Sequence, residues 1–393
     1  MKRVAVLGGG PAGAFAAERL ARAGVYTVVF DEKLAWEKPC GGGLTYKAWN
    51  QYPFLVENDT PKRFITHTNI GAHKVGSARL TLKQPLLIYS RFDLNGMLLK
   101  RAENAGAQME KERVLALERR GSGWHVRTRR GTLNADFCVI ATGARNPLRG
   151  VGTEWQPGDT ATALGYYVPG EQEQIDIQFL PGLEGYIWVF PRCGHLSVGI
   201  CGKNHPASTM RLWLEQYMRE HCLSLVGARF YAHVLPSLGR SAWLRNRVAG
   251  EGWMAVGDAA GMVDPITGEG LYYAMRSGDL ASQVILDESL APEAKGQAYR
   301  RTLREDFMAD LEFAALLAGR VYHERFLFGS VPARMVQFTR HSQRFCGLMQ
   351  DLFAGTQSYL GLKSRLLRGL HGTMGEAIMG FFLHRLIPEN QAG

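Results

Sequence analysis

Long hydrophobic runs are missing from this sequence of 393 residues. No stretch of about 18 consecutive apolar residues occurs, so we expect no transmembrane helix. A buried strand is predicted from residue 4, which leaves no room for a signal peptide, and we expect none. Low-complexity tracts and fixed-period repeats are also absent, which argues against a solenoid or a propeller.

Cysteine and acidic residues are both scarce. The six cysteines are scattered and form no C-x-x-C pair, so we expect reduced thiols, no metal site and a cytoplasmic protein. Lys and Arg outnumber Asp and Glu by 46 to 36, and the net charge of +10 favours anionic partners such as phosphates, pyrophosphates or a membrane surface. Nucleic acid is not expected as a partner, because the basic residues are dispersed and no recognition motif accompanies them.

A glycine-rich turn follows the first predicted strand. Gly8, Gly10 and Gly13 have the G-x-G-x-x-G spacing, which combines a tight turn, close approach to a pyrophosphate and close packing of the next helix. That helix directs its N-terminal N–H groups at the phosphates. Asp31 ends the second predicted strand, where an acid accepts hydrogen bonds from a ribose. We therefore predict a dinucleotide site, which also includes the neighbouring residues Pro11, Ala12 and Glu32.

A second glycine cluster follows Pro39 and Cys40, at residues 41–43. Such a loop is typical of backbone pressed against a flat group or against another backbone. The alternative is a flexible tether, which Pro39 disfavours. Cys40 either has a chemical role or only packs, because its reactivity depends on a pKa that the sequence does not give. We predict that Cys40, Gly41 and Gly42 lie at the cofactor.

Three further segments complete the predicted cofactor domain. Arg91 lies between a strand at 86–89 and a helix, where its guanidinium reaches a phosphate or forms a surface ion pair. Val114, in a strand predicted over 113–118, is assigned to the same site. A buried strand over 137–141 fits a parallel sheet.

An aromatic strand stands out in the next block, which has short alternating strands typical of an antiparallel sheet over a ligand pocket. Tyr186, Trp188 and Phe190 share one face at period two. The intervening residues are also apolar, so one face packs in a core and the other meets something else. The alternative is a purely structural aromatic stripe. We predict that these three residues and Pro191 line a substrate pocket.

The chain then returns to the first domain through Gly257 and Asp258, whose carboxylate accepts hydrogen bonds from ribitol or ribose hydroxyls. Gly268, Gly270 and Leu271 open a helix predicted over 272–286, whose N-terminal amides suit the charge of a reduced flavin ring.

The remaining sequence is predicted to be helical near 296–320, 333–353 and 375–386. Between residues 314 and 385 it has nine Lys or Arg against three Asp or Glu. This region is either a helical cap over the pocket or a basic amphipathic surface in peripheral contact with an anionic membrane.

These segments predict an α/β protein with a Rossmann-type FAD-binding domain, an α+β insert and a helical C-terminal region. The FAD-binding domain spans 1–150 and returns at 248–290. The antiparallel substrate-binding sheet spans 151–247, and the helical region spans 291–393.

The chain up to about residue 290 resembles the geranylgeranyl reductase family, within the flavoproteins related to p-hydroxybenzoate hydroxylase. The resemblance rests on the glycine turn, Pro39-Cys40-Gly41-Gly42, Ser90-Arg91, Tyr186-x-Trp188-x-Phe190-Pro191 and Gly257-Asp258. It implies FAD, with Gly8–Gly13 and Arg91 at the pyrophosphate, Asp31 at the adenosine ribose and Asp258 at the ribityl chain. It also implies reduction of isoprenoid or other apolar C=C bonds by hydride from flavin N5, with a proton from Cys40 or a held water.

Two departures leave alternatives open. Thr142 stands where the related hydroxylases have an Asp, and no second G-x-G-x-x-G is present, so the electron donor is NAD(P)H, a ferredoxin or another carrier. The first alternative function is an FAD-dependent monooxygenase or halogenase that uses a flavin hydroperoxide. Against a halogenase, Tyr186 and Phe190 replace the Trp and Ile of the related Trp-x-Trp-x-Ile-Pro stretch. The second is a flavin-bound, non-enzymatic membrane-surface or assembly protein.

Overall fold

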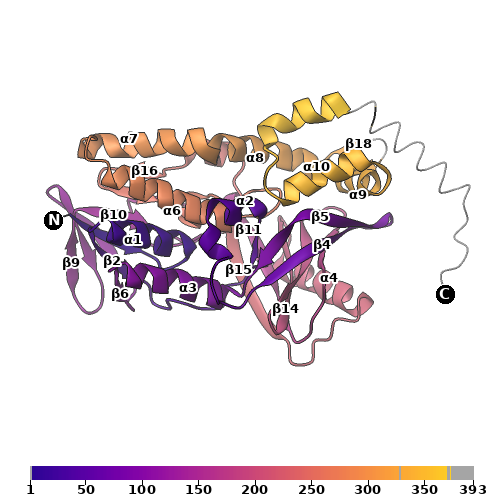
Figure 1. Cartoon of the computed structure of the whole chain (residues 1–393), viewed down its shortest axis with the longest axis horizontal. Helices are drawn as coiled ribbons and strands as arrows, with labels where there is room; N and C mark the ends of the chain where they lie inside the picture. The colour runs from indigo at the N-terminus through magenta and orange to yellow at the C-terminus, as the bar shows by residue number, and fades with distance from the viewer. Residues whose placement is uncertain (1, 327–328, 370–371, 373–393) are drawn as a thin grey trace, which may run out of the picture.

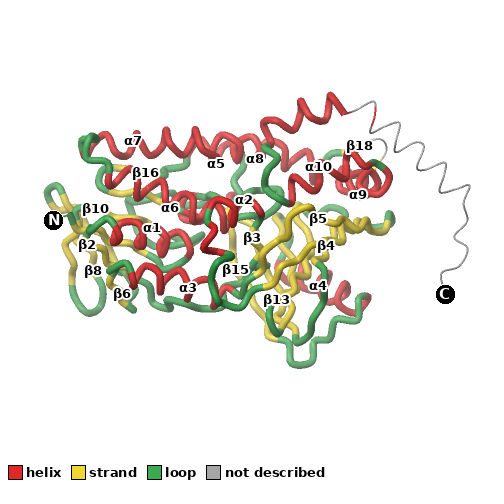
Figure 2. Tube along the Cα trace, in the orientation of Figure 1, coloured by secondary structure: helices red, strands yellow, loops and turns green. Residues whose placement is uncertain are grey.

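The computed structural model describes residues 2–326, 329–369 and 372. Two sheets lie side by side, and a row of helices runs along one edge of both (Figure 1). The helices of the last third of the chain extend from the first sheet to the second (Figure 2). This arrangement places the C-terminal region over the junction of the two sheets.

The first sheet has six strands in the order β16-β17-β10-β1-β2-β6. All neighbours are parallel except β16 and β17. The bounds are β1 Arg3–Leu7, β2 Tyr26–Phe30, β6 Gln108–Glu110, β10 Phe137–Ile140, β16 Ala249–Gly250 and β17 Trp253–Ala255. The central strands are apolar and buried, as parallel strands covered on both faces are. The predicted Rossmann-type sheet and the return of the chain after residue 248 are confirmed.

Three helices position the cofactor side of this sheet: α1 (Pro11–Arg22), α3 (Arg91–Asn104) and α6 (Leu271–Leu286). Helix α1 begins directly after the glycine turn, with Gly10 as its N-cap residue and Pro11 in its first turn. Helix α6 packs against α1 at Gly278, where an added Cβ would lie 2.4 Å from the Ala12 carbonyl oxygen. This close packing holds the middle of α6 against the first turn of α1. Two short helical turns, α2 (Tyr46–Gln51) and η1 (Pro53–Leu55), follow at residues 46–55.

The second sheet has eight strands in the order β15-β11-β14-β13-β12-β4-β5-β3. Only β12 and β4 pair in parallel. The bounds are β3 Gly43–Leu44, β4 Arg63–Ala72, β5 Gly76–Ile88, β11 Thr160–Val168, β12 Ile175–Phe179, β13 Glu184–Arg192, β14 His195–Lys203 and β15 Arg229–Pro236. The chain therefore enters this sheet twice, because β3, β4 and β5 precede residue 150. The strand predicted at 86–89 is only the end of β5, and β4 was missed because polar residues interrupt its apolar alternation.

Helix α4 (Ala207–Glu220) covers the outer face of the second sheet. Its Met210, Leu214 and Met218 form a core with Ile187 and Val189 of β13, so the opposite face of β13 is the one directed at the cavity described below.

A separate antiparallel sheet links β6 to β10; its strands are β7 Ala116–Arg120, β8 Gly123–Arg127 and β9 Thr132–Ala135. Short turns complete this part: η2 Pro157–Asp159, α5 Arg240–Arg245 and η3 Gly257–Ala260.

The C-terminal region is mainly helical. Its elements are α7 Pro292–Leu303, a π-helical turn Arg304–Met308, α8 Ala309–His323, β18 Arg325–Phe326, β19 Gly329–Ser330, α9 Val331–His341 and α10 Gln343–Phe353. Residues 359–369 are also helical. The helix predicted over 333–353 is broken at Ser342, whose hydroxyl caps α10 by accepting from the Phe345 N–H. The helix predicted over 375–386 lies outside the described residues.

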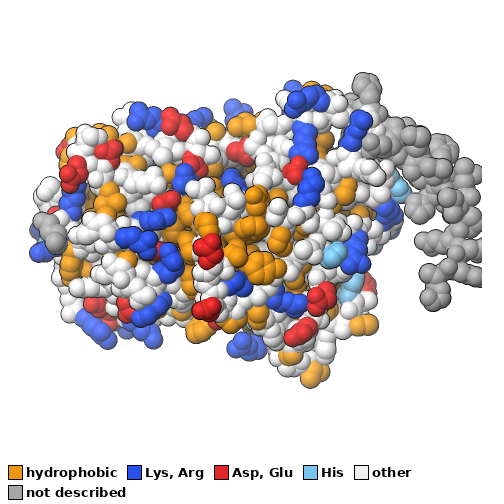
Figure 3. Space-filling view, in the orientation of Figure 1, with side chains coloured by type: hydrophobic (Ala, Val, Ile, Leu, Met, Phe, Trp, Pro, Cys, Tyr) orange, Lys and Arg blue, Asp and Glu red, His pale blue; other side chains and the backbone are white. Residues whose placement is uncertain are grey.

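Helices α9 and α10 pack on the second sheet. Val336 and Met349 share a core with Ile70 of β4 and Leu80 of β5, as expected for a helical cap. Figure 3 shows Lys and Arg side chains over these helices and hydrophobic side chains at the middle of the same face. Within the described part of the chain, no helix combines the length and the apolar character that crossing a bilayer requires.

Candidate cofactor and substrate cavity

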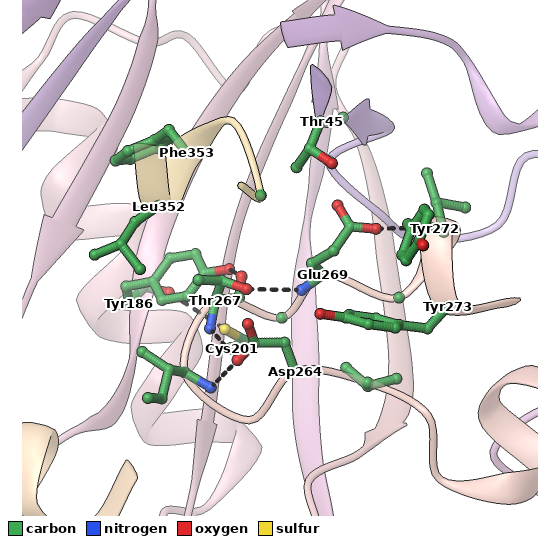
Figure 4. Close-up of a pocket in the computed structure, with 18 of the residues that line it drawn as sticks. Thr45, Tyr186, Cys201, Asp264, Thr267, Glu269, Tyr272, Tyr273, Leu352 and Phe353 are labelled. Atoms are coloured by element: carbon green, nitrogen blue, oxygen red, sulfur yellow. Dashed lines mark hydrogen bonds between the residues drawn. The ribbon is translucent and has the colours of Figure 1, made fainter. Parts of the chain in front are cut away.

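A cavity of about 1020 Å³ lies between the two sheets and the C-terminal helices. Its lining begins at the N-terminus of α1, continues across the inner face of the second sheet and reaches α8, α9 and α10. Figure 4 shows the part where β13, the 264–270 loop and the C-terminal helices meet. Residues predicted from distant parts of the sequence are therefore brought to one space.

The glycine turn forms one end of the cavity. A Cβ added at Gly8 would lie 2.1 Å from the Ala141 carbonyl oxygen, and one at Gly13 would lie 2.0 Å from the Gly8 carbonyl oxygen. Gly8 also has a φ of +120°, which side-chain-bearing residues rarely adopt. Gly10, by contrast, has open space at its Cβ position and lines the cavity with Pro11 and Ala12. The turn therefore fits a group that approaches its backbone at Gly10.

Arg91 is a buried cation beside this turn. Its side chain is 3% exposed, and one of its terminal nitrogens donates to Asn95 Oδ1 over 3.3 Å. Its Nε–H has no hydrogen-bond partner, and no carboxylate pairs with it among the described residues. A surface ion pair is therefore wrong for Arg91. The unpaired N–H in the cavity wall suits an anionic ligand.

Asp31, predicted at the ribose, and Glu32, predicted in the same cofactor site, both lie outside the cavity lining. Asp31 Oδ2 accepts from the Gly9 N–H over 2.7 Å, and its Oδ1 accepts from the Lys33 and Leu34 N–H groups. Asp31 thus fixes the backbone of the glycine turn. Glu32 is exposed, 3.9 Å from an Arg113 nitrogen.

Asp258 lines the cavity and pairs with Lys38, with 2.8 Å between Oδ2 and Nζ. Burial raises the pKa of Asp258, but the charge and hydrogen bond of Lys38, together with the Arg91 charge, leave this pKa below its usual value. Nearby, burial and then the Lys38 charge lower the pKa of His233 to about 4. At neutral pH this wall therefore carries an ionised carboxylate, an ammonium and a neutral imidazole.

The loop at residues 40–43 is pressed against a flat ring and another backbone, as predicted. A Cβ at Gly41 or Gly43 would lie 3.2 or 2.9 Å from the Phe190 ring, and one at Gly42 would lie 2.1 Å from the Tyr89 carbonyl oxygen. The alternative of a flexible tether is wrong. Cys40 lines the cavity, and its Sγ accepts from the Gly42 N–H over 3.3 Å.

Tyr186, Trp188 and Phe190 all line the cavity, which confirms that the second face of β13 meets a space. Trp188 lies over Gly199, where an added Cβ would be 2.3 Å from the indole. Tyr186 differs from the expected apolar wall in one respect, because its hydroxyl donates to the Thr267 carbonyl oxygen. Pro191 is buried and, like Val114 and Gly257, is not part of the cavity lining.

Comparison with known proteins places this geometry in a family. The sequence profile of the pyridine nucleotide-disulphide oxidoreductases matches residues 2–164. The chain is 30% identical over 321 residues to the chloroplastic geranylgeranyl diphosphate reductase of Arabidopsis thaliana, covering 73% of this chain and 66% of that relative. It is 27% identical over 354 residues to digeranylgeranylglycerophospholipid reductase 2 of Methanothermobacter thermautotrophicus, covering 80% and 88%. The chain belongs to the geranylgeranyl reductase family of FAD-dependent oxidoreductases.

A solved structure shares the fold. The geranylgeranyl bacteriochlorophyll reductase-like protein of Thermoplasma acidophilum superposes with a TM-score of 0.76 and 21% identity, covering 94% of this chain and 99% of that one. At this identity the likeness shows the fold, including the C-terminal region beyond residue 290.

The sequence did not reveal the polar group that holds the Cys40 loop in this reductase-family chain. Arg192 is fully buried; it forms an ion pair with Glu37, donates to the Cys40 carbonyl oxygen and lies 3.3 Å from the Gly41 carbonyl oxygen. Ser197 Oγ also donates to the Cys40 carbonyl oxygen, over 2.9 Å. A cationic residue at the end of the aromatic strand, directly after Pro191, was the available signal.

The 264–270 loop was recognised only for its glycines, yet it carries two acids of the cavity wall. Burial raises the pKa of Asp264, and burial raises that of Glu269 to about 7. Glu269 Oε1 accepts from the Tyr272 N–H over 2.8 Å at the start of α6 (Figure 4). Gly268, Gly270 and Leu271, all predicted, line the cavity beside it.

Many apolar residues of the cavity lining come from the C-terminal region, where no family motif was recognised. They include Leu317, Val321, Met335, Phe338, Phe345, Leu348, Met349, Leu352, Phe353 and Leu362. An apolar chain entering from this side would reach the aromatic face of β13 and the Cys40 loop.

Proposed function

We propose that this protein uses FAD to reduce carbon–carbon double bonds of an isoprenoid lipid or another apolar alkene. The observation that carries the proposal is the single cavity that joins the glycine turn and Arg91 to the apolar wall of the C-terminal helices. Relatives named geranylgeranyl diphosphate reductase and digeranylgeranylglycerophospholipid reductase support an isoprenoid substrate.

The residues at the glycine-turn end fit FAD. The amides at the start of α1, the open space at Gly10 and the unpaired Arg91 N–H suit a pyrophosphate. Asp31 keeps the turn in shape and lies at the strand end where a ribose is expected. The ionised Asp258 accepts hydrogen bonds from ribityl hydroxyls, and Lys38 keeps it ionised. Bound FAD, once reduced, supplies two electrons and one hydrogen to the alkene.

The second hydrogen requires a proton held in the cavity. Three acids of the cavity lining already have partners: Asp258 forms an ion pair with Lys38, Asp264 accepts from the Tyr359 hydroxyl, and Asp306 forms an ion pair with Arg276. Glu269 Oε1 accepts from the Tyr272 N–H, and the raised pKa of about 7 keeps much of the carboxyl protonated at neutral pH. We therefore propose Glu269 as the proton source and keep Cys40 Sγ as the alternative.

The apolar lining serves the same reaction by excluding water from the reduced cofactor and the alkene. Trp188 and Phe190 approach from the sheet, and Phe345 and Leu352 approach from α10. For electron supply we propose NAD(P)H or a ferredoxin, and stopped-flow reduction of the FAD by each distinguishes them.

Peripheral membrane contact is proposed for the 359–369 helix. Leu360, Leu366 and Leu367 are 55%, 40% and 59% exposed, and Leu366 also lines the cavity. Lys363 and Arg368 on the same helix add positive charge. Sedimentation with phosphatidylglycerol vesicles should exceed that with phosphatidylcholine vesicles at low salt; equal binding would contradict this contact.

The function is tested by reducing the FAD with dithionite under anaerobic conditions and adding geranylgeranyl diphosphate. We expect reoxidation of the FAD that depends on the lipid, with two hydrogens gained per reduced bond. If the lipid has no effect and air instead yields an oxygenated or halogenated product, the protein is an oxygen-using flavoenzyme.

A further inference from the structure

Three tyrosine hydroxyls from separate parts of the chain converge on the 264–270 loop. Tyr186 of β13 donates to the Thr267 carbonyl oxygen. Tyr322 of α8 donates to the Ile266 carbonyl oxygen over 2.6 Å. Tyr359, at the start of the 359–369 helix, donates to Asp264 Oδ2 over 2.7 Å. The substrate sheet and two C-terminal helices thus hold one loop of seven residues.

Asp264 closes the loop on itself. Its Oδ1 accepts from the Ile266 and Thr267 N–H groups over 2.8 and 3.2 Å. Its own N–H donates to the Glu269 carbonyl oxygen over 2.8 Å, and its carbonyl oxygen accepts from the Gly268 N–H over 2.9 Å. Because Tyr359 uses the remaining carboxylate oxygen, a change at Tyr359 acts on the whole loop (Figure 4 shows Asp264, Thr267 and Tyr186).

Two of the three tyrosines are buried and Tyr186 is half-buried. Tyr322 and Tyr359 are 8% and 5% exposed, and burial raises the pKa of all three phenols well above the usual value. The hydroxyls therefore remain donors at neutral pH. Removing a buried donor leaves its acceptor unsatisfied, which is more costly than the net value of the hydrogen bond. The Leu360 N–H also donates to Asp310 of α8 over 2.9 Å, which fixes the segment that carries Tyr359.

The loop joins the two ends of the cavity. It leads directly into α6, whose N-cap residue is Gly270, and a Cβ at Gly270 would lie 3.8 Å from Asp258 Oδ1. The same loop residues, from Asp264 to Gly270 except Pro265, line the cavity, as do Tyr186 and Tyr359. A shift of this loop therefore moves the α6 N-terminus relative to the cofactor end.

We propose that Tyr186, Tyr322 and Tyr359 are positioning residues that hold the 264–270 loop, and through it the α6 N-terminus, in place against the FAD. This inference rests on the FAD site proposed above and assigns a role to the C-terminal region beyond covering the substrate. The positive end of α6 favours the more negative, reduced form of the cofactor. Loosening the loop therefore weakens the preference of the site for reduced over oxidised FAD.

The test is the midpoint potential of the bound FAD, measured without any alkene in wild type, Tyr359→Phe and Tyr322→Phe. We expect each variant to have a more negative potential. A tenfold loss of preference for the reduced form corresponds to about 30 mV for a two-electron couple. The matched control is Tyr166→Phe, which also loses a hydroxyl bond, to Glu215 over 2.5 Å, but at a residue outside the cavity lining. Its potential should stay at the wild-type value.

Potentials of both loop variants equal to wild type, with FAD bound, would overturn the inference. A shift of the same size in Tyr166→Phe would also overturn it, because the effect would then not be specific to the loop. If Tyr359→Phe does not fold, Tyr322→Phe decides by the same criterion. Because the potential is measured without substrate, a shift supports the positioning role of the tyrosines even if the protein reduces no isoprenoid. Conversely, if the potentials are unchanged while alkene reduction is intact, the positioning role of the tyrosines is rejected and the proposed function is not.

Discussion

Arg192 Nε lies 3.3 Å from the Gly41 carbonyl oxygen, and the same guanidinium pairs with Glu37. A fully buried cation thus holds the loop that carries Cys40. The Glu37 carboxylate also accepts from the Arg91 N–H over 2.9 Å. The loop at the cavity and the helix that presents Arg91 are therefore fixed by one ion pair.

Replacing Arg192 by Met should destabilise the protein strongly, because Glu37 is left half-buried without its counter-charge. Loss of one partner of a buried pair typically costs about 3–5 kcal/mol, which denaturant unfolding of the FAD-loaded protein measures. Arg63→Met is the control: its partner Glu173 is exposed, and a change within about 0.5 kcal/mol is expected. Equal effects of the two variants would contradict the role of Arg192.

The same pair predicts a pH dependence of stability. Burial raises the pKa of Glu37, but the Arg192 guanidinium and the hydrogen bonds from the Arg91 and Phe92 N–H groups together leave this pKa below its usual 4.5. The unfolded chain therefore binds this proton more readily, so the stabilisation is present above pH 4.5 and is lost as pH falls through the lowered pKa. Between pH 6 and pH 3 the free energy of unfolding should fall more steeply in wild type than in Arg192→Met. Parallel curves would refute the contribution of the Glu37–Arg192 pair to this pH dependence.

The glycine turn allows a matched pair of substitutions. Gly13→Ala should destabilise the fold, because its Cβ would lie 2.0 Å from the Gly8 carbonyl oxygen. Gly10→Ala should leave the thermal stability of the FAD-free protein unchanged, since nothing lies within 4 Å of its Cβ position, but should weaken FAD binding. We expect the Kd for FAD, measured by fluorescence titration, to rise at least about tenfold, which is roughly 1.4 kcal/mol of binding free energy. Wild-type FAD affinity in Gly10→Ala would contradict the site.

The pH profile of alkene reduction tests Glu269. Its carboxyl is protonated below a pKa of about 7, so the rate should be high at pH 6 and should fall as pH rises through 7. Glu269→Gln keeps an acceptor for the Tyr272 N–H but has no acid proton; it should reduce kcat by about a hundredfold or more and remove this pH limb. If Glu269→Gln retains the profile and Cys40→Ala loses it, Cys40 is the proton source instead.

The length of the substrate should depend on α10. Leu352 lines the apolar end of the cavity, so Leu352→Trp should block long chains. We expect kcat/KM for a C20 isoprenoid to fall about tenfold or more, equivalent to roughly 1.4 kcal/mol of lost transition-state stabilisation, while a C10 substrate is little affected. Leu244→Trp, at a position 83% exposed on α5, is the control. Equal losses for both chain lengths would place the substrate elsewhere.

Local patterns in the sequence were sufficient to predict the glycine turn, the Cys40 loop and the aromatic face of β13. Each depends on residues a few positions apart, where turn geometry or strand alternation determines the outcome. Contacts between distant residues were not predictable in this way. Arg192 and Glu37 are separated by 155 residues, and Tyr359 and Asp264 by 95. Strand β4 was missed because its polar residues conceal the alternation that its pairing with β5 and β12 makes clear.

The central claim is that bound FAD passes its electrons to a carbon–carbon double bond in the apolar cavity. The most direct measurement is an anaerobic titration of the dithionite-reduced protein with geranylgeranyl diphosphate, with flavin absorbance and lipid mass followed together. We predict one double bond reduced for each FAD reoxidised, with loss of this reaction in Gly10→Ala. FAD that stays reduced with excess lipid, or that is reoxidised without a gain of two hydrogens in the lipid, would contradict the claim.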